Sequence, residues 1–129
     1  KSNLNSNQTK KYPLDVESAF EKLCSELSLE AAVTLTQALI EMLPGKGQEL
    51  EQIFETDERE AISRFGHSMK SICRMNGLQE LAELTAELEG SAKDLSKQDL
   101  EVLIKVVQRE IKDAEKGLTE LVQTHSLTV

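Results

Sequence analysis

Apolar residues recur every three or four positions along almost the whole chain from Asp15 onward. This spacing places them on one face of an α-helix, whereas a half-buried strand needs apolar residues at every second position. Hydrophobic residues make up 39% of the 129-residue chain, but aromatic residues only 3%. An aliphatic core favours packed helices over a β-sandwich or barrel, which draw on aromatic and β-branched side chains. We therefore expect a single all-α domain.

The first two predicted helices begin at residues that can cap them. Asp15 can cap a short helix, and Ser28 can cap a long one. Leu43 and Leu50 lie seven positions apart and keep the same phase across Pro44. This predicts one long kinked helix that extends to about residue 55, with a true break at Pro44 as the alternative. The inward faces of the two helices are expected to hold Val16, Ala19, Phe20, Leu23 and Leu27, then Ala32, Leu35, Thr36, Leu39, Met42 and Leu43.

Three more helices follow. Asp57 and Glu60 have capping-box spacing for a third helix, which Asn76 and Gly77 end. A fourth helix is predicted over residues 78–93, and Ser96 starts the last one, with Asp99 in its first turn. Short connections between long helices predict an antiparallel four-helix bundle with a short N-terminal cap helix over residues 14–123. The last two inward faces comprise Leu78, Leu81, Ala82, Thr85 and Leu88, then Leu100, Leu103, Ile104, Val107, Ile111, Ala114, Leu118, Leu121 and Val122.

The ends of the chain and its two cysteines carry no sign of a site. Residues 1–13 are polar and aperiodic and are expected to be a flexible linker, and residues 124–129, with His125, an inert frayed tail. Cys24 and Cys73 fall in apolar helical patterns and are read as buried free thiols. There is no run of 18 apolar residues and no signal peptide, so we expect a cytoplasmic protein without direct membrane contact. A net charge of −8 argues against nucleic-acid binding.

The third predicted helix has two distinct faces. At about 100° per residue, Ile62, Phe65, Gly66, Met69, Ile72 and Cys73 all fall within about 60° of Met69. His67 lies about 160° from this apolar centre and is expected to face solvent, between Ser63 and Ser71. This placement excludes a buried core histidine. It leaves open an ordinary exposed histidine with no function.

The charge around His67 is unlike that of the rest of the chain. Residues 61–79 contain no acidic residue but include Arg64, Lys70 and Arg74, a local charge of +3. The rest of the chain has 12 of the 15 basic residues against all 23 acidic ones, a net −11. A cationic, serine-lined surface around an exposed imidazole suits a phosphoryl group. Neutral imidazole has a free ring nitrogen that can act as a nucleophile.

The residues around His67 are also similar to a known family. His67-Ser68-Met69-Lys70-Ser71-Ile72, followed by Gly77, resembles the motif of histidine-containing phosphotransfer (HPt) domains. In that pattern an apolar residue, a lysine and a small residue follow the histidine at two, three and four positions, with a glycine at ten. The residues after Gly77 resemble the family's next helix, and the resemblance extends over about residues 15–123. The main departure from the family pattern is Ser71, where glycine is usual. Gly66 stands where the family often has alanine, and we expect this second departure to matter little.

The resemblance implies a phosphorelay intermediate with the same bundle fold. His67 would accept a phosphoryl group from a receiver-domain aspartate and pass it to another receiver domain. Lys70 would neutralise phosphate charge, and Ser71 would leave room beside the imidazole. Ser63, Arg64 and Arg74 are the predicted partner-binding residues. The chain would need no cofactor or metal of its own, because Mg²⁺ would be bound by the receiver partner.

The same resemblance suggests a setting for the domain. We expect a monomeric phosphotransfer module without an ATP-binding site, because the glycines at positions 45 and 47 form no nucleotide-binding loop. Whether such a module counts as an enzyme is left open. The linker-like start favours the C-terminal module of a hybrid sensor histidine kinase, tethered to a membrane sensor through upstream chain.

Four alternatives remain. The chain can be a helical scaffold without phosphoryl chemistry, or the N-terminal phosphotransfer module of a chemotaxis kinase. A kinase dimerisation helix is disfavoured, since Ser68 stands where an acidic residue normally follows the histidine. A metal site of His67, Cys73 and Cys24 is the weakest idea, because Cys73 falls on the apolar face.

Overall fold

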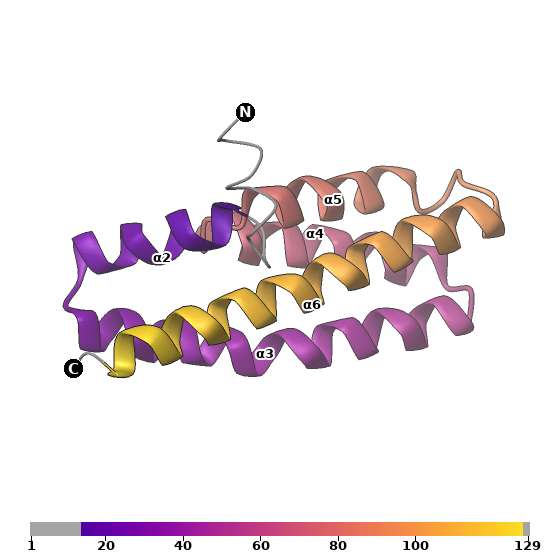
Figure 1. Ribbon diagram of the computed structural model, residues 1–129. Helices are drawn as coiled ribbons and strands as arrows, with labels where there is room; N and C mark the ends of the chain where they lie inside the picture. The colour runs from indigo at the N-terminus through magenta and orange to yellow at the C-terminus, as the bar shows by residue number, and fades with distance from the viewer. Residues whose placement is uncertain (1–13, 128–129) are drawn as a thin grey trace, which may run out of the picture.

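The structure is a computed structural model that describes residues 14–127, and these residues form an all-helical bundle (Figure 1). Both the linker predicted at residues 1–13 and the last two residues lie outside the described part. The described helices are α2 (Leu14–Glu26), α3 (Leu29–Glu55), α4 (Arg59–Met75), α5 (Gln79–Ser91) and α6 (Lys97–Leu127). The predicted all-α class is therefore confirmed.

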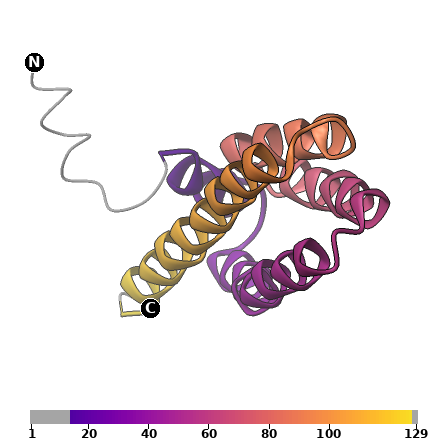
Figure 2. The same ribbon diagram turned by 90° about the vertical axis from the view of Figure 1, so that its right-hand side faces the viewer.

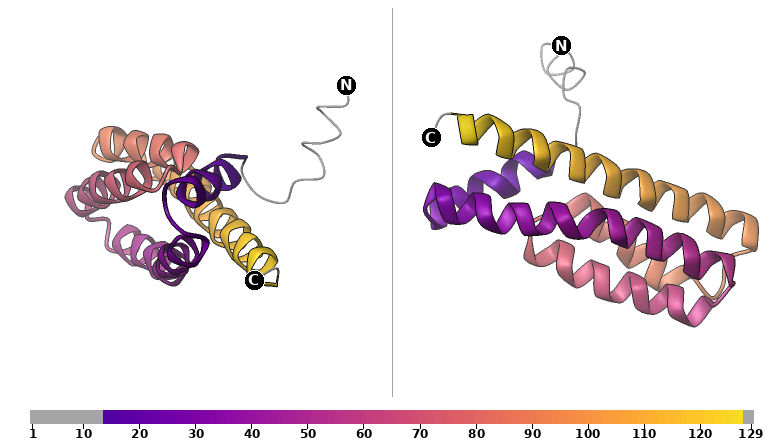
Figure 3. Two further views of the ribbon diagram at one scale, coloured as in Figure 1. Left: turned by 90° about the vertical axis from the view of Figure 1, so that its left-hand side faces the viewer. Right: turned by 90° about the horizontal axis from the view of Figure 1, so that it is seen from below.

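Four of these helices surround a common centre, in the order α3, α4, α5, α6 (Figure 2). Successive helices run in opposite directions, and the closest pairings are α4 with α5 and α3 with α6. The α4–α5 hairpin is shorter than the α3–α6 pair. Helix α2 lies beside the remaining length of that pair, in line with the hairpin (Figure 3). This is the predicted antiparallel bundle with a short N-terminal cap helix.

The core is built almost entirely from aliphatic side chains. All nine predicted inward residues of α6 are buried, as are all five predicted for α5. Two predicted core residues are instead exposed. Leu27 follows the last residue of α2 and is 40% exposed, and Leu35 is 52% exposed on the outer side of α3. Leu23, Leu39 and Met42 are only partly buried.

Helix α3 continues without interruption through Pro44, so the alternative of a break at this residue is wrong. Because the phase is kept, Leu43 and Leu50 are both fully buried. The side chain of Gln108 in α6 supports this region. Its Nε2 donates hydrogen bonds to the carbonyl oxygen of Gly47 at 3.2 Å and to Glu51 Oε1 at 2.9 Å.

Three of the predicted helix ends are confirmed by their hydrogen bonds. Ser28 Oγ accepts from the amide of Ala31 at 3.1 Å, and Ser96 Oγ accepts from the amide of Asp99 at 3.1 Å. At the end of α4, Gly77 has φ +76°. The amides of the two residues after Asn76 donate back to carbonyls of the last turn, the Schellman arrangement that favours glycine.

The capping box predicted at Asp57 and Glu60 is wrong. The residue before α4 is Glu58, and its side chain makes no capping hydrogen bond. Asp57 instead ends α3, in the left-handed conformation at φ +56°, with its amide bonded to the carbonyl of Phe54. Aspartate tolerates this conformation. Its carboxylate accepts from Arg59 Nε at 2.9 Å, and this contact holds its pKa below the usual range.

The C-terminal prediction also needs correction. Helix α6 continues to Leu127, so residues 124–127, expected to fray, are helical. The centroid of the His125 ring lies 4.8 Å from the centroid of the Phe20 ring in α2. This histidine therefore packs against the cap helix and is not part of an inert tail.

Candidate functional site

Helix α4 has the two faces that its sequence predicts. Ile62, Phe65, Gly66, Met69 and Cys73 are buried, and Ile72 is partly buried. The side chain of His67 is 65% exposed on the opposite face. The burial of one stripe against the bundle thus fixes the outward orientation of His67.

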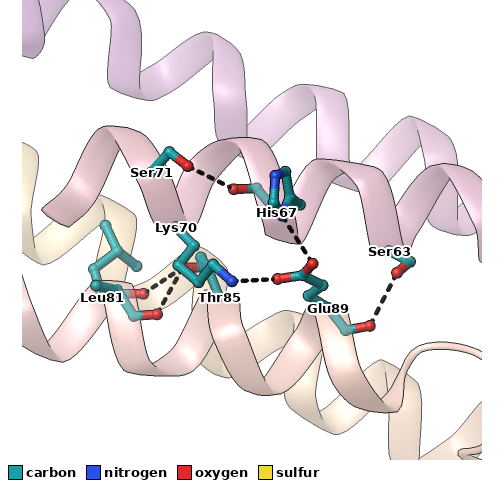
Figure 4. Close-up of polar contacts among 8 residues, drawn as sticks. Ser63, His67, Lys70, Ser71, Leu81, Thr85 and Glu89 are labelled. Carbon is teal, nitrogen blue, oxygen red and sulfur yellow. Dashed lines mark hydrogen bonds and ion pairs between the residues drawn. The ribbon is translucent and has the colours of Figure 1, made fainter. Parts of the chain in front are cut away.

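A carboxylate from the neighbouring helix completes the site. Glu89 lies in the last turns of α5, and its Oε2 is 2.9 Å from Nδ1 of His67 (Figure 4). Its second oxygen, Oε1, lies 2.8 Å from Nζ of Lys70. One glutamate therefore joins the histidine and lysine that the sequence singled out.

Sequence reasoning gave Glu89 no role, although a signal for it exists. In an antiparallel hairpin, residues about equally far from the turn lie opposite each other. His67 and Glu89 are 10 positions before and 12 positions after Gly77. Glu89 lies outside the acid-free segment 61–79, so the local charge of that segment does not include it.

The ion pair defines the protonation of Glu89. The hydrogen bond from Lys70, followed by that from His67, lowers its pKa, while partial desolvation opposes the shift. Glu89 is therefore an ionised acceptor at neutral pH and cannot donate a proton to the ring. Nδ1 of neutral His67 must then carry the hydrogen, which leaves the lone pair of Nε2 free.

Ser63 and Ser71, predicted on either side of His67, have different environments. Ser63 is partly buried on the α5 side, and its Oγ donates to the backbone carbonyl oxygen of Glu89 at 2.9 Å. Ser71 is exposed, and its Oγ donates back to the carbonyl oxygen of His67 at 3.4 Å. Only Ser71 therefore leaves its surface open beside the imidazole.

The positive charge near His67 is smaller than the sequence alone suggests. Lys70 is only 19% exposed and is paired with Glu89, so its charge is largely compensated. Arg64 and Arg74 are exposed. The local charge of +3 counted from the sequence is thus reduced by Glu89, and the surface consists of two exposed arginines flanking a paired lysine.

A shallow groove lies between α4 and α3, on the side of α4 away from Glu89. Arg64 and Ser68 line it from α4, and Lys46 and Ile53 from α3. Lys46 also forms an ion pair with Glu49 at 3.4 Å. The groove is therefore lined by both polar and apolar side chains.

The described residues give the metal hypothesis no support. Cys73 is fully buried, and burial raises the pKa of its thiol to about 12. Cys24 is only partly buried, in α2. Within residues 14–127, no three histidine, cysteine or acidic side chains are grouped as metal ligands would be. In the same part of the chain, no helix combines the length and apolarity needed to span a bilayer.

Comparison with known protein families identifies the family of the chain. The family model of the Hpt domain matches residues 34–123, which include α4, α5, most of α3 and most of α6. No significant match was found among curated proteins or among solved structures. Hpt domains are helical phosphotransfer modules of two-component signalling, and they interact with receiver domains. The matched region covers most of the chain and both helices that build the site around His67, and the chain therefore belongs to the Hpt domain family.

Proposed function

We propose that His67 accepts a phosphoryl group on Nε2 from a receiver-domain aspartate and passes it to a second receiver domain. The observation that carries this proposal is the contact between Nδ1 and Glu89 Oε2 at 2.9 Å on a histidine that is 65% exposed. The contact keeps the proton on the inner nitrogen. The outer nitrogen is then a nucleophile accessible to another protein's active site.

Each of the two transfer steps consists of one nucleophilic attack on phosphorus. In the acceptance step, Nε2 attacks phosphorus, the N–P bond forms, and the P–O bond to the donor aspartate breaks. The released aspartate leaves as a carboxylate, and the imidazole of His67 becomes positively charged because Nδ1 keeps its proton. Glu89 stabilises this charge. In the second step, the acceptor carboxylate attacks phosphorus and the neutral imidazole leaves.

Lys70 and Ser71 have supporting roles in this proposal. The ammonium of Lys70 has three N–H donors, so it can keep Glu89 and still donate to a phosphoryl oxygen. The short side chain of Ser71 leaves space for the partner's active site. The chain itself would need no cofactor, since the receiver domain would hold Mg²⁺.

Partner binding is assigned to the exposed side of α4. Arg64 lines the groove beside His67, and Arg74 is exposed near the end of the helix. Ser63 was also predicted to bind a partner, but its hydroxyl is engaged with α5, which favours an internal role. We further propose a monomeric cytoplasmic module, attached to a hybrid sensor histidine kinase.

Transfer from a phosphorylated receiver domain tests the proposal. The wild-type chain should acquire acid-labile phosphate, and His67→Gln should abolish the label. His125→Gln is the matched control, because it removes the other histidine of the chain and should leave labelling unchanged. Absence of label on the wild type with several candidate receivers would overturn the relay and favour a scaffold. Labelling by a chemotaxis kinase domain but by no receiver would identify the alternative phosphotransfer module.

A further inference from the structure

The backbones of α4 and α5 approach each other closely at Gly66. A Cβ atom added to this glycine would lie 2.7 Å from the amide nitrogen of Glu89 and 2.8 Å from the carbonyl oxygen of Thr85. Both are backbone atoms of α5, so no side-chain rotation could relieve the contact. The earlier expectation that Gly66 matters little is therefore wrong. Glycine at this position is what allows α5 to lie so close to the histidine helix.

A second contact holds the same turn of α5. The hydroxyl of Ser63, one turn before His67, donates to the carbonyl oxygen of Glu89 at 2.9 Å (Figure 4). Ser63 and Gly66 thus contact the backbone of Glu89, while His67 and Lys70 contact its carboxylate. These four residues lie along one side of α4 and all contact the same residue.

We propose that Ser63 and Gly66 are positioning residues that place the Glu89 carboxylate on Nδ1 of His67 and thereby select the nucleophilic nitrogen. Ordinary van der Waals contacts of a Cβ begin at 3.4 Å, so an alanine at position 66 would push α5 away by roughly 0.7 Å. A hydrogen bond of 2.9 Å lengthened by that amount reaches about 3.6 Å, where it no longer counts as one.

Nitrogen-15 NMR of the imidazole tests the positioning role of Ser63 and Gly66, because it reports which ring nitrogen of His67 carries the proton. The wild type should hold its proton on Nδ1. Gly66→Ala should lower the ratio of the Nδ1–H to the Nε2–H form about tenfold, the loss expected for one hydrogen bond to a charged acceptor. Ser63→Ala should lower it in the same direction by a smaller factor. Gly90→Ala is the matched control, because its added methyl group, next to Glu89, meets open space.

A second set of variants separates positioning from a general effect on structure. In a Glu89→Ala background, Gly66→Ala and Ser63→Ala should cause no further change in the tautomer ratio, because they act through Glu89. A folded Gly66→Ala protein with the wild-type tautomer would overturn the proposal, as would a shift that persists without Glu89. Should Gly66→Ala fail to fold, Ser63→Ala decides in the same way.

The consequence of this positioning for transfer rate depends on the proposed function, but the tautomer measurement needs no phosphoryl group and no partner. A wild-type chain that takes no phosphate would therefore refute the relay without affecting the positioning result. Conversely, a labelled His67 with an unchanged tautomer in both variants would refute the positioning and leave the relay intact.

Discussion

Deprotonation of Glu110 is expected to lower the stability of the bundle as the pH rises from about 4.5 to about 7. This residue of α6 is partly buried. Its carboxyl is hydrogen-bonded to that of Glu80 on α5, and Asp113 and Asp15 add further negative charge. Burial, followed by the contact with Glu80, raises the pKa of Glu110 to about 7. Asp15 is held in this cluster by its own hydrogen bond, in which Oδ2 accepts from the amide of Glu80 at 2.8 Å.

The sign and size of the effect follow from proton linkage. The ordinary pKa of glutamate is 4.5, so between pH 4.5 and about 7 the folded chain binds more protons at Glu110 than the unfolded chain. The free energy of unfolding therefore decreases as pH rises through this window. A pKa raised this far corresponds to a change of about 3 kcal/mol in the free energy of unfolding across this window. Solvent screening of a partly exposed carboxyl reduces this change to about 1 kcal/mol. The lowered pKa of Glu89 acts in the opposite sense but only below about pH 4.5.

Urea unfolding at pH 5 to 8 measures the effect against Glu110→Gln. Glutamine mimics the protonated side chain at every pH, so the stability advantage of the wild type at pH 5 over pH 8 should be about 1 kcal/mol larger than that of the variant. Glu115→Gln is the matched control, because Glu115 lies on the same helix but lines a separate pocket between α6 and α3, with Gln48 and Lys112; it should keep the wild-type dependence. Equal pH dependence in the wild type and Glu110→Gln would refute the reasoning.

Two further predictions concern the ends of the α4–α5 hairpin. Gly77→Ala should lower the free energy of unfolding by about 1–2 kcal/mol, because φ is +76° and the new methyl group would lie 3.1 Å from Cβ of Ala19. Gly45→Ala is the control and should not lower it, because the new methyl group would meet open space. Arg59→Ala should cost about 2 kcal/mol in the same urea assay, because Nη1 donates to the carbonyl oxygens of Ala92 and Leu95 at 2.8 Å. A loss below 0.5 kcal/mol, the scale of ordinary surface substitutions, would contradict either prediction.

Features decided by neighbouring residues in the sequence were predicted correctly. The inward stripe of α6 follows from helical periodicity alone, and all nine of its residues are buried. The caps at Ser28 and Ser96 and the turn at Gly77 also depend only on local chemistry. Periodicity further placed His67 on the exposed face, because a helix with one apolar stripe can be buried in one orientation only.

Features that depend on another helix were missed. Asp57 has the spacing of a cap for α4, but the preceding helix needs a left-handed residue at its end, and Arg59 engages the carboxylate. Leu35 continues the apolar pattern of α3 on a side that no helix of residues 14–127 covers completely, so it is exposed. Glu89 and the tight contact at Gly66 exist only because α5 folds back along α4. No local pattern encodes that distance.

The two sides of α4 have different roles in the proposed relay: the α5 side sets the tautomer of His67, and the α3 side binds the partner. On the α5 side, Ser63 and Lys70 are both occupied by Glu89, and Nδ1 of His67 faces the same carboxylate. An incoming receiver domain must therefore reach Nε2 from the other side, where Arg64 borders the groove toward α3. Ser63→Ala and Gly66→Ala, on the α5 side, should change the tautomer of His67 and leave partner affinity intact. Arg64→Ala should weaken partner binding and leave the tautomer unchanged, because Arg64 lines the groove toward α3 and not the α5 side of the helix.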